Sequence, residues 1–251
     1  MLEVQSLRKS FGGVAAVDGV SLSFPAGSLT AIIGPNGAGK STLFNLISGG
    51  LKPDSGRILL DDVDLVGKPR AAVVRAGIAR AFQVASIFPS LTVKQTLLAT
   101  VAARQGRSAH MQRRFPLPET VGPVEEVACM LGLGDKLDAI AAELSHGDQK
   151  LLDIALALAL EPRVLLLDEP TAGMGSSERW RMMEKVYQLW STKKTTLIFI
   201  EHDMDIVFKF APSIRVLCYG RVLAEGGPDA IRSNPAVIEA YLGASSESVT
   251  A

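Results

Sequence analysis

The chain has 251 residues, 47% of them hydrophobic, which is enough to bury the core of one large α/β domain. Its 26 basic residues balance its 26 acidic residues, so the overall charge predicts no nucleic-acid partner and no attraction to an anionic membrane. Apolar runs such as Leu151–Leu160 are far shorter than the roughly 20 residues of a membrane-spanning helix, and no signal peptide is evident, so we expect a cytoplasmic protein.

The first third of the chain predicts short strands over Leu2–Leu7, Val20–Phe24 and Leu29–Ile33. A glycine-rich loop then leads into a predicted helix over Ser41–Ser48, followed by a turn and a strand over Arg57–Asp61. A strand, a loop and a helix in this order are typical of a phosphate-binding site.

The middle of the chain is mostly helical in pattern, with a loop over 105–123 that contains three prolines. This change predicts a helical subdomain over 84–150, inserted into a core formed by 1–83 and 151–243 within a single domain, 1–243. Residues 244–251 are mostly small and polar, so we expect a disordered tail.

Cys129 and Cys218 each lie in an apolar stretch, which predicts buried free thiols.

Helices and strands alternate after the insertion, which favours an α/β core. The predicted elements are a helix over Gly147–Leu160, a strand over Val164–Leu167, a helix over Ser177–Trp190, a strand over Thr196–Ile200, a hairpin over Ile214–Ala224, and two short helices that begin at Pro228 and Pro235.

The strongest motif is the glycine-rich loop, which has the pattern G-x-x-x-x-G-K-[ST] after a predicted strand. Its residues are Gly34, Pro35, Asn36, Gly37, Ala38, Gly39, Lys40, Ser41 and Thr42. Glycines let successive backbone N–H groups point at phosphate oxygens, and the helix N-terminus adds a favourable dipole. We therefore predict an ATP site in which Lys40 reaches the β- and γ-phosphates and Ser41 is a ligand of Mg²⁺. The alternative is a glycine-rich turn with an incidental lysine.

Two carboxylates follow the apolar strand Val164–Leu167, where ligand sites of parallel sheets lie. We predict that Asp168 binds Mg²⁺ through water and that Glu169 polarises the water that attacks ATP. An ordinary polar loop is the alternative for this motif taken alone. The phosphate loop upstream favours the catalytic interpretation.

Residues 144–149 resemble the ABC signature Leu-Ser-Gly-Gly-Gln, which lies between the two motifs above in that family. The resemblance covers almost the whole chain and implies the ABC ATPase architecture. That architecture is an α/β P-loop NTPase core, with a mixed sheet and an N-terminal antiparallel β part, plus an inserted α-helical subdomain. It also implies that Phe11 stacks on adenine, that Gln83 is the Q-loop glutamine near Mg²⁺, and that His202 is the switch histidine of catalysis. Residues 172–174 are placed like the D-loop.

Each of these residues has another interpretation. Phe11 could be ordinary core, Gln83 a solvated side chain, and His202 a surface histidine beside two carboxylates. Ser145 and Asp148 also form an S-x-x-D capping box, which is compatible with phosphate binding at the same helix N-terminus.

The signature departs from the family pattern at His146 and Asp148. We expect Ser145 and Gly147 to contact a γ-phosphate and the Asp148 carboxylate to point away from it, because two negative charges repel each other.

Three C-terminal segments, 200–208, 220–226 and 234–243, resemble the ATPase subunits of branched-chain amino-acid importers, with urea and aromatic-acid importers sharing the pattern. The resemblance implies an ATPase on the inner face of the membrane. Its implied partners are a transmembrane permease, a second ABC ATPase subunit of the same or a paralogous chain, and, indirectly, a solute-binding protein. A soluble ABC ATPase acting on DNA or the ribosome, and a small P-loop kinase or GTPase, are the alternatives. The first lacks its usual insertions or second cassette here, and the second leaves the signature unexplained.

Overall fold

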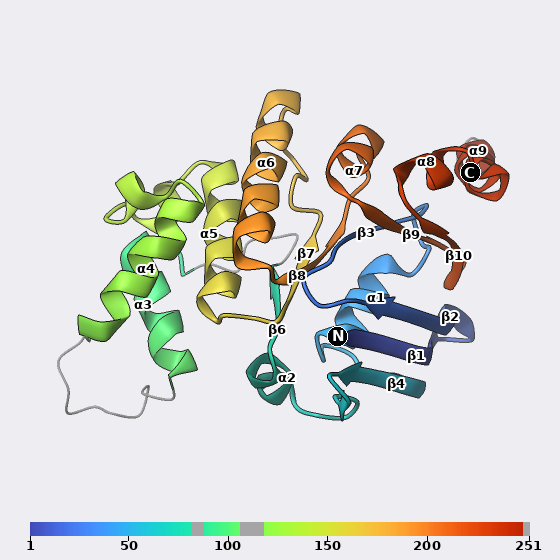
Figure 1. Ribbon diagram of the computed structural model, residues 1–251, viewed down its shortest axis with the longest axis horizontal. Coiled ribbons are helices and arrows are strands. Elements are labelled where there is room, and N and C mark those ends of the chain that lie inside the picture. The colour runs from blue at the N-terminus through green and yellow to red at the C-terminus, as the bar shows by residue number, and fades with distance from the viewer. Residues whose placement is uncertain (82–87, 106–117, 248–251) are drawn as a thin grey trace. The chain divides into compact units, whose positions relative to one another are not determined.

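A computed structural model describes residues 1–81, 88–105 and 118–247 of the chain. The chain divides into two compact units (Figure 1). Unit 1 comprises Met1–Ala76 and Lys194–Ala251, and unit 2 comprises Gly77–Lys193. Along the part of the chain that is described, no helix combines the length and apolar character needed to cross a membrane.

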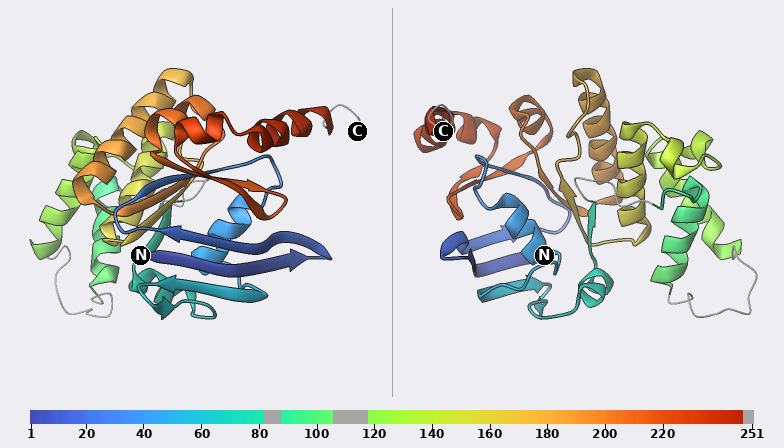
Figure 2. Two further views of the ribbon diagram at one scale, coloured as in Figure 1. Left: turned by 45° about the vertical axis from the view of Figure 1, so that its right-hand side comes forward. Right: turned by 180° about the vertical axis from the view of Figure 1, so that it is seen from behind.

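Unit 1 begins with an antiparallel sheet whose strand order is β2-β1-β4-β5. The strands are β1 (Leu2–Phe11), β2 (Val14–Phe24), β4 (Ser55–Leu60) and β5 (Val63–Asp64). In β1, Leu2 and Val4 are buried on one face, and an irregularity at Ser6, whose φ is +47°, returns Leu7 to that face. The left view of Figure 2 shows β1, β2 and β4 running side by side, with α1 behind them.

The second set of strands in unit 1 has the order β10-β9-β3-β8. Its strands are β3 (Leu29–Ile33), β8 (Thr196–Ile200), β9 (Ser213–Cys218) and β10 (Arg221–Gly226). Strand β3 is parallel to both β8 and β9, whereas β9 and β10 form an antiparallel hairpin. Every residue of β3 and β8 is buried, which is why both strands are almost continuously apolar in sequence.

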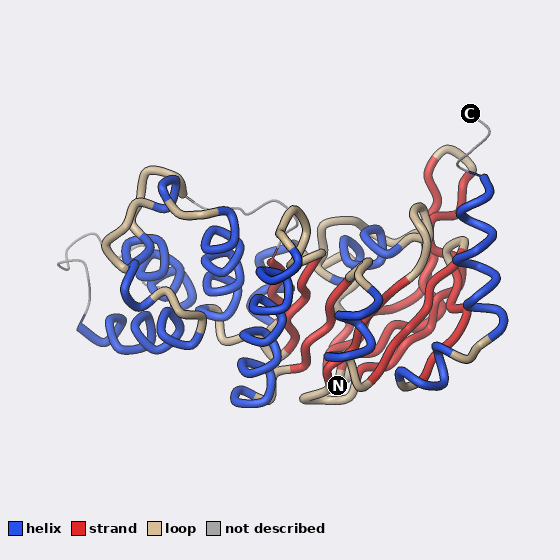
Figure 3. Tube along the Cα trace, turned by 90° about the horizontal axis from the view of Figure 1, so that it is seen from above, coloured by secondary structure: helices blue, strands red, loops and turns tan. Residues whose placement is uncertain are grey.

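The helices of unit 1 accompany these strands, and Figure 3 shows α9 running beside them. They are α1 (Lys40–Ile47), α2 (Arg70–Ala76), α7 (Met204–Phe210), α8 (Pro228–Arg232) and α9 (Pro235–Glu247). We expected residues 244–251 to be disordered. Instead α9 continues through Glu247, because none of Ala244, Ser245 and Ser246 is a strong helix breaker. Residues 248–251 lie outside the described part.

Unit 2 contains a parallel pair of strands and a group of helices. The strands are β6 (Ile78–Ala81) and β7 (Val164–Asp168), which pair directly. The helices are α3 (Val93–Arg104), α4 (Pro118–Met130), α5 (His146–Ala159) and α6 (Ser176–Lys193), with 3₁₀ turns at Gly134–Lys136 and Ala141–Glu143. Helices α3, α4 and α5 pack against one another.

The mixed α/β fold with an N-terminal antiparallel part is confirmed. The helices between β6 and β7 occupy most of the segment 84–150 that the sequence predicts to be helical, although the compact unit that holds them extends further, from Gly77 to Lys193. The expectation of buried cysteines is wrong for Cys129, which is exposed, while Cys218 is half-buried. Both thiols are free.

Candidate active site

The glycine-rich loop lies in unit 1, between the end of β3 and the start of α1. Gly39 immediately precedes α1 and has a φ of +97°, a region that suits glycine. A Cβ atom at Gly39 would lie 2.1 Å from the carbonyl oxygen of Ala16, and one at Gly34 would lie 2.1 Å from that of Leu217. The two motif glycines are therefore required by close backbone contacts as well as by the turn itself.

Lys40 is the first residue of α1, and its side chain folds back over the loop. Its Nζ atom donates to the carbonyl oxygens of Gly34, at 2.7 Å, and Pro35, at 2.9 Å. The ammonium group is thus held inside the loop whose N–H groups are expected to bind phosphates. Ser41, which follows, is exposed, and Thr42 is half-buried.

Residues far along the chain support this loop, and they could not be identified from the sequence. The turn after β9 contributes Gly220, whose N–H donates to the Ala38 carbonyl oxygen at 3.1 Å and whose own carbonyl accepts from the Asp18 N–H at 2.8 Å. Tyr241 of α9 forms a hydrogen bond with the backbone of Gly34. Burial raises the pKa of Tyr241 to about 12, although the bond to Gly34 acts in the opposite direction.

Two further predicted residues lie in unit 1. Phe11 pairs with Val14 at the tip of the β1–β2 hairpin, and 48% of its surface is exposed, so it is not a core residue. The Lys9 ammonium group lies 5.6 Å from the centre of its ring. His202 is exposed and follows β8, whose Ile200 pairs with Ile32 of β3. Because these parallel strands are neighbours, His202 and the phosphate loop leave the same edge of the sheet.

The carboxylates of the second motif lie in unit 2, at the end of β7. Asp168 is buried, and its Oδ2 atom accepts from Arg80 Nη2 at 2.5 Å. The side chains of this ion pair are only 6% and 7% exposed. Its other oxygen, Oδ1, is buried without a hydrogen-bond partner among the described residues. Buried polar atoms normally have partners, so an unsatisfied carboxylate oxygen here fits a position that serves a hydrated cation.

Glu169 is the next residue, and its backbone has a φ of +48°. Non-glycine residues rarely adopt this conformation, and such strain is commonly found at functional sites. The half-buried Glu169 accepts from the Ala172 N–H at 3.1 Å through its carbonyl oxygen, which closes the turn at the end of the strand. The strain therefore lies at the residue for which the sequence predicts catalysis.

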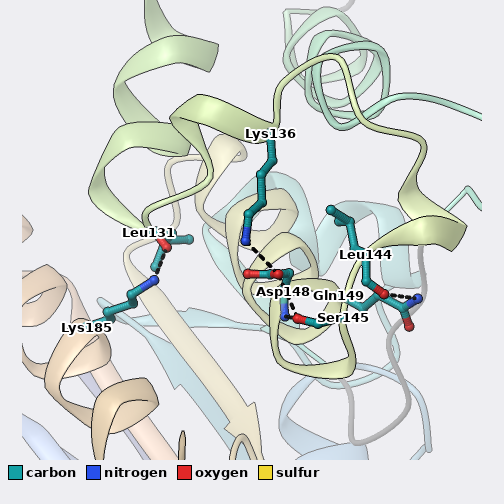
Figure 4. Close-up of polar contacts among 7 residues, drawn as sticks. All are labelled: Leu131, Lys136, Leu144, Ser145, Asp148, Gln149 and Lys185. Carbon is teal, nitrogen blue, oxygen red and sulfur yellow. Dashed lines mark hydrogen bonds and ion pairs between the residues drawn. The ribbon is translucent and has the colours of Figure 1, made fainter.

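The signature-like segment begins α5 in unit 2 (Figure 4). Ser145 is the N-cap residue, and its Oγ atom accepts from the Asp148 N–H at 3.1 Å, which confirms the serine half of the predicted capping box. The Asp148 carboxylate accepts from Ser145 Oγ and from Lys136 Nζ, both at 2.7 Å. Burial raises the pKa of Asp148, but hydrogen bonds from Lys136 and Ser145, with the charges of Lys136 and Lys185, outweigh it and lower the pKa.

Gly147 and His146 of the signature segment lie close to residues of two other segments of unit 2. A Cβ atom at Gly147 would lie 2.2 Å from Oε1 of Glu178, so a larger residue here would require the Glu178 side chain to move. His146 Nε2 lies 3.4 Å from the Ala172 carbonyl oxygen, in the segment placed like the D-loop. Ser145, Gly147 and Asp148 line a pocket of about 230 Å³, which Glu178, Arg181 and Lys185 also line.

The predicted site residues are thus distributed between the two units. Unit 1 holds the phosphate loop, Phe11 and His202, and unit 2 holds Asp168, Glu169 and the start of α5. Gln83 lies outside the described residues. Arg80 and Lys136 were not predicted from the sequence. A single arginine within the otherwise apolar strand Ile78–Ala81 was the available signal for Arg80, whereas no local signal marks Lys136.

Comparison with known proteins places these motifs in one family. The family model described as "ABC transporter" matches residues 17–172, and the model "Branched-chain amino acid ATP-binding cassette transporter" matches residues 221–247. The high-affinity branched-chain amino acid transport ATP-binding protein LivG of Escherichia coli is 36% identical, covering 97% of this chain and 98% of LivG. The corresponding protein BraF of Pseudomonas aeruginosa is 35% identical with the same coverage.

A solved structure supports the same assignment. The ADP conformation of MJ1267, an ATP-binding cassette of an ABC transporter, has a TM-score of 0.85 and 34% sequence identity, covering 97% of this chain and 98% of that one. Together with the phosphate loop, the paired carboxylates and the capped signature segment, these similarities show that the chain belongs to the ABC transporter family, as an ATP-binding and ATP-hydrolysing cassette of the branched-chain amino-acid type.

Proposed function

We propose that this chain powers the uptake of branched-chain amino acids, or of a related small polar solute, by hydrolysing ATP on a separate permease. The observation that carries this proposal is the full-length similarity to LivG and BraF, together with the match of residues 221–247 to the branched-chain amino-acid model. That C-terminal segment includes Tyr241, which contacts the phosphate loop, so the part that distinguishes this group also supports the nucleotide site.

ATP binding is assigned to the residues of unit 1. The backbone N–H groups of the loop, residues 34–42, bind the phosphates, and Lys40 exchanges its bonds to Gly34 and Pro35 for bonds to the β- and γ-phosphates. The exposed ring of Phe11 stacks on adenine. The exposure of Phe11 and the position of Lys40 inside the loop support these roles.

Magnesium binding is assigned to Ser41, Gln83 and Asp168. The unsatisfied Oδ1 atom of Asp168 supports its role, because a carboxylate oxygen is a preferred ligand for a hydrated divalent cation. When bound, Mg²⁺ neutralises charge on the β- and γ-phosphates and orients them. Arg80 holds Asp168 through its other oxygen, which would leave Oδ1 available to a hydrated cation.

Hydrolysis is assigned to Glu169 and His202. Glu169 orients and polarises the attacking water by accepting its hydrogen bond, while His202 contacts the γ-phosphate. The left-handed backbone of Glu169 supports a specialised role at this position. His202 is exposed and follows β8, which is paired with β3, the strand that precedes the phosphate loop. This position supports a contact between His202 and the γ-phosphate.

The working unit is a pair of cassettes, in which Ser145 and Gly147 of one copy contact the γ-phosphate held by the other. The exposed hydroxyl of Ser145 at a helix N-terminus, beside a pocket lined by Arg181 and Lys185, supports an anion-binding role. Closure of the pair drives a transmembrane permease on the inner face of the membrane. A solute-binding protein delivers the solute to that permease.

The test is ATP-dependent dimerisation of the Glu169→Gln variant, measured by size exclusion with and without Mg-ATP, beside wild-type ATPase activity. The substituted amide retains the shape of the glutamate side chain but cannot accept a proton, so the variant should form a dimer with ATP and lose turnover. A variant that stays monomeric and hydrolyses ATP at the wild-type rate would refute both the shared site and the role of Glu169. A monomer without turnover would point to a paralogous partner cassette.

A further inference from the structure

The hydroxyl proton of Ser145 is already donated within the signature segment itself. Ser145 Oγ accepts the N–H of Asp148, which caps α5, and donates its one proton to the Asp148 carboxylate at 2.7 Å. A hydroxyl group has a single proton to donate. Ser145 therefore cannot donate to an incoming phosphate oxygen until its bond to Asp148 is broken.

Asp148 is itself held in place by Lys136, from the 3₁₀ turn Gly134–Lys136. Figure 4 shows Lys136 and Ser145 converging on the Asp148 carboxylate from different sides, while Lys185 is directed to the carbonyl oxygen of Leu131, 2.8 Å away. The same oxygen, Oδ2, accepts from both Lys136 and Ser145. Lys136 thus competes with Ser145 for the same carboxylate oxygen of Asp148, and its positive charge partly neutralises the negative charge that attracts the serine proton.

The Asp148 side chain is 17% exposed, and with Ser145 and Gly147 it lines one pocket. A carboxylate in this position repels a phosphate group in addition to competing for the serine proton. Hydrogen bonds to charged acceptors are roughly twice as strong as those between neutral groups, so the competition is significant.

We propose that Asp148 is a positioning residue that holds the Ser145 hydroxyl proton and sets how much ATP is needed to engage the signature segment, and that Lys136 weakens this hold. This inference rests on the proposed role of Ser145 as a γ-phosphate contact. It assigns a function to the carboxylate at the position where the family pattern has glutamine.

The proposal requires that the two members of one ion pair have opposite effects. Asp148→Asn keeps the size of the side chain and the backbone cap, but it offers a neutral acceptor. The ATP concentration for half-maximal ATPase activity should then fall about three- to tenfold, with kcat nearly unchanged. Lys136→Met leaves the carboxylate fully charged, so that concentration should rise. A purely structural ion pair would move both variants in the same direction.

Two controls separate the hold on the proton from general electrostatics. Asp135→Asn removes a negative charge close to Lys136, but Asp135 does not receive the Ser145 proton, which is donated to Asp148. Asp135→Asn should therefore change the half-maximal ATP concentration less than Asp148→Asn does. In a Ser145→Ala background there is no proton to hold, so Asp148→Asn should no longer lower the half-maximal ATP concentration. Asp148→Gln, which restores the family residue, provides a second neutral variant if Asp148→Asn folds poorly.

The experiment is a set of ATPase titrations with the full chain of each variant at one protein concentration. Opposite shifts for Asp148→Asn and Lys136→Met, with the Asp148→Asn effect lost in the Ser145→Ala background, are the expected result. Shifts in the same direction, or an Asp148→Asn effect that persists without the Ser145 hydroxyl, overturn the inference alone. A wild-type chain without any ATPase activity, both alone and with its paralogous cassette, refutes the proposed function, and the inference is refuted with it.

Discussion

The buried ion pair between Arg80 and Asp168 predicts a large loss of stability when only one partner is removed. In Arg80→Met the Asp168 carboxylate stays in a site where its side chain is 6% exposed, with its cationic partner gone. Breaking a buried ion pair in this way costs about 3–5 kcal/mol, because the remaining charge is left uncompensated. Asp168→Asn together with Arg80→Met removes both charges, so the double variant should be more stable than Arg80→Met alone.

The assay is urea unfolding of the nucleotide-free chain, with the free energy of unfolding taken from the midpoint and slope. Arg221→Met is the matched control, because Arg221 also bonds an aspartate, Asp18, but has a side chain that is 72% exposed. It should lose much less stability. Equal losses for Arg80→Met and Arg221→Met, or additive losses for Arg80→Met and Asp168→Asn, would refute the assignment of a coupled buried pair.

Two further predictions concern the phosphate loop. Gly39→Ala should lower the free energy of unfolding more than Gly37→Ala. Both residues have positive φ, which costs about 1–2 kcal/mol for alanine, but only the Gly39 Cβ atom would collide with a carbonyl oxygen. Equal losses in urea unfolding would contradict this. The pKa of Tyr241 is raised to about 12 in the folded state, against about 10 in the unfolded chain. The contribution of the neutral phenol to stability is therefore complete below about pH 10 and is lost as the pH rises toward 12, by at most about 1.4 kcal/mol per pH unit. Tyr241→Phe should lack this component of the decline, which unfolding measurements from pH 9 to 11 will detect.

Sequence reasoning succeeded where the signal was continuous along the chain. The phosphate loop is one run of residues between a buried strand and a helix, and β3, β7 and β8 are almost continuously apolar because they are buried on both faces. It was less accurate where a local irregularity broke the pattern. The strand predicted over Leu2–Leu7 continues to Phe11, past the irregularity at Ser6.

Contacts between residues far apart in the chain could not be predicted from the sequence. Arg80 and Asp168 are separated by 88 positions, and neither residue type nor spacing indicates that they meet. Cys129 shows a different failure. Its neighbours in sequence are apolar, but the helical period of α4 buries Val124 and Ala128, which leaves Cys129 on another face of the helix. Apolar composition alone did not indicate which face of the helix each residue would occupy.

The bonds from Lys40 to Gly34 and Pro35 close the phosphate loop around the Lys40 ammonium group using only groups of the chain itself. The conformational entropy of ordering that loop is therefore lost when the chain folds, and it does not reduce nucleotide affinity a second time. Binding then needs one side chain to exchange two carbonyl partners for phosphate oxygens, a rearrangement on the timescale of rotamer changes rather than of loop closure.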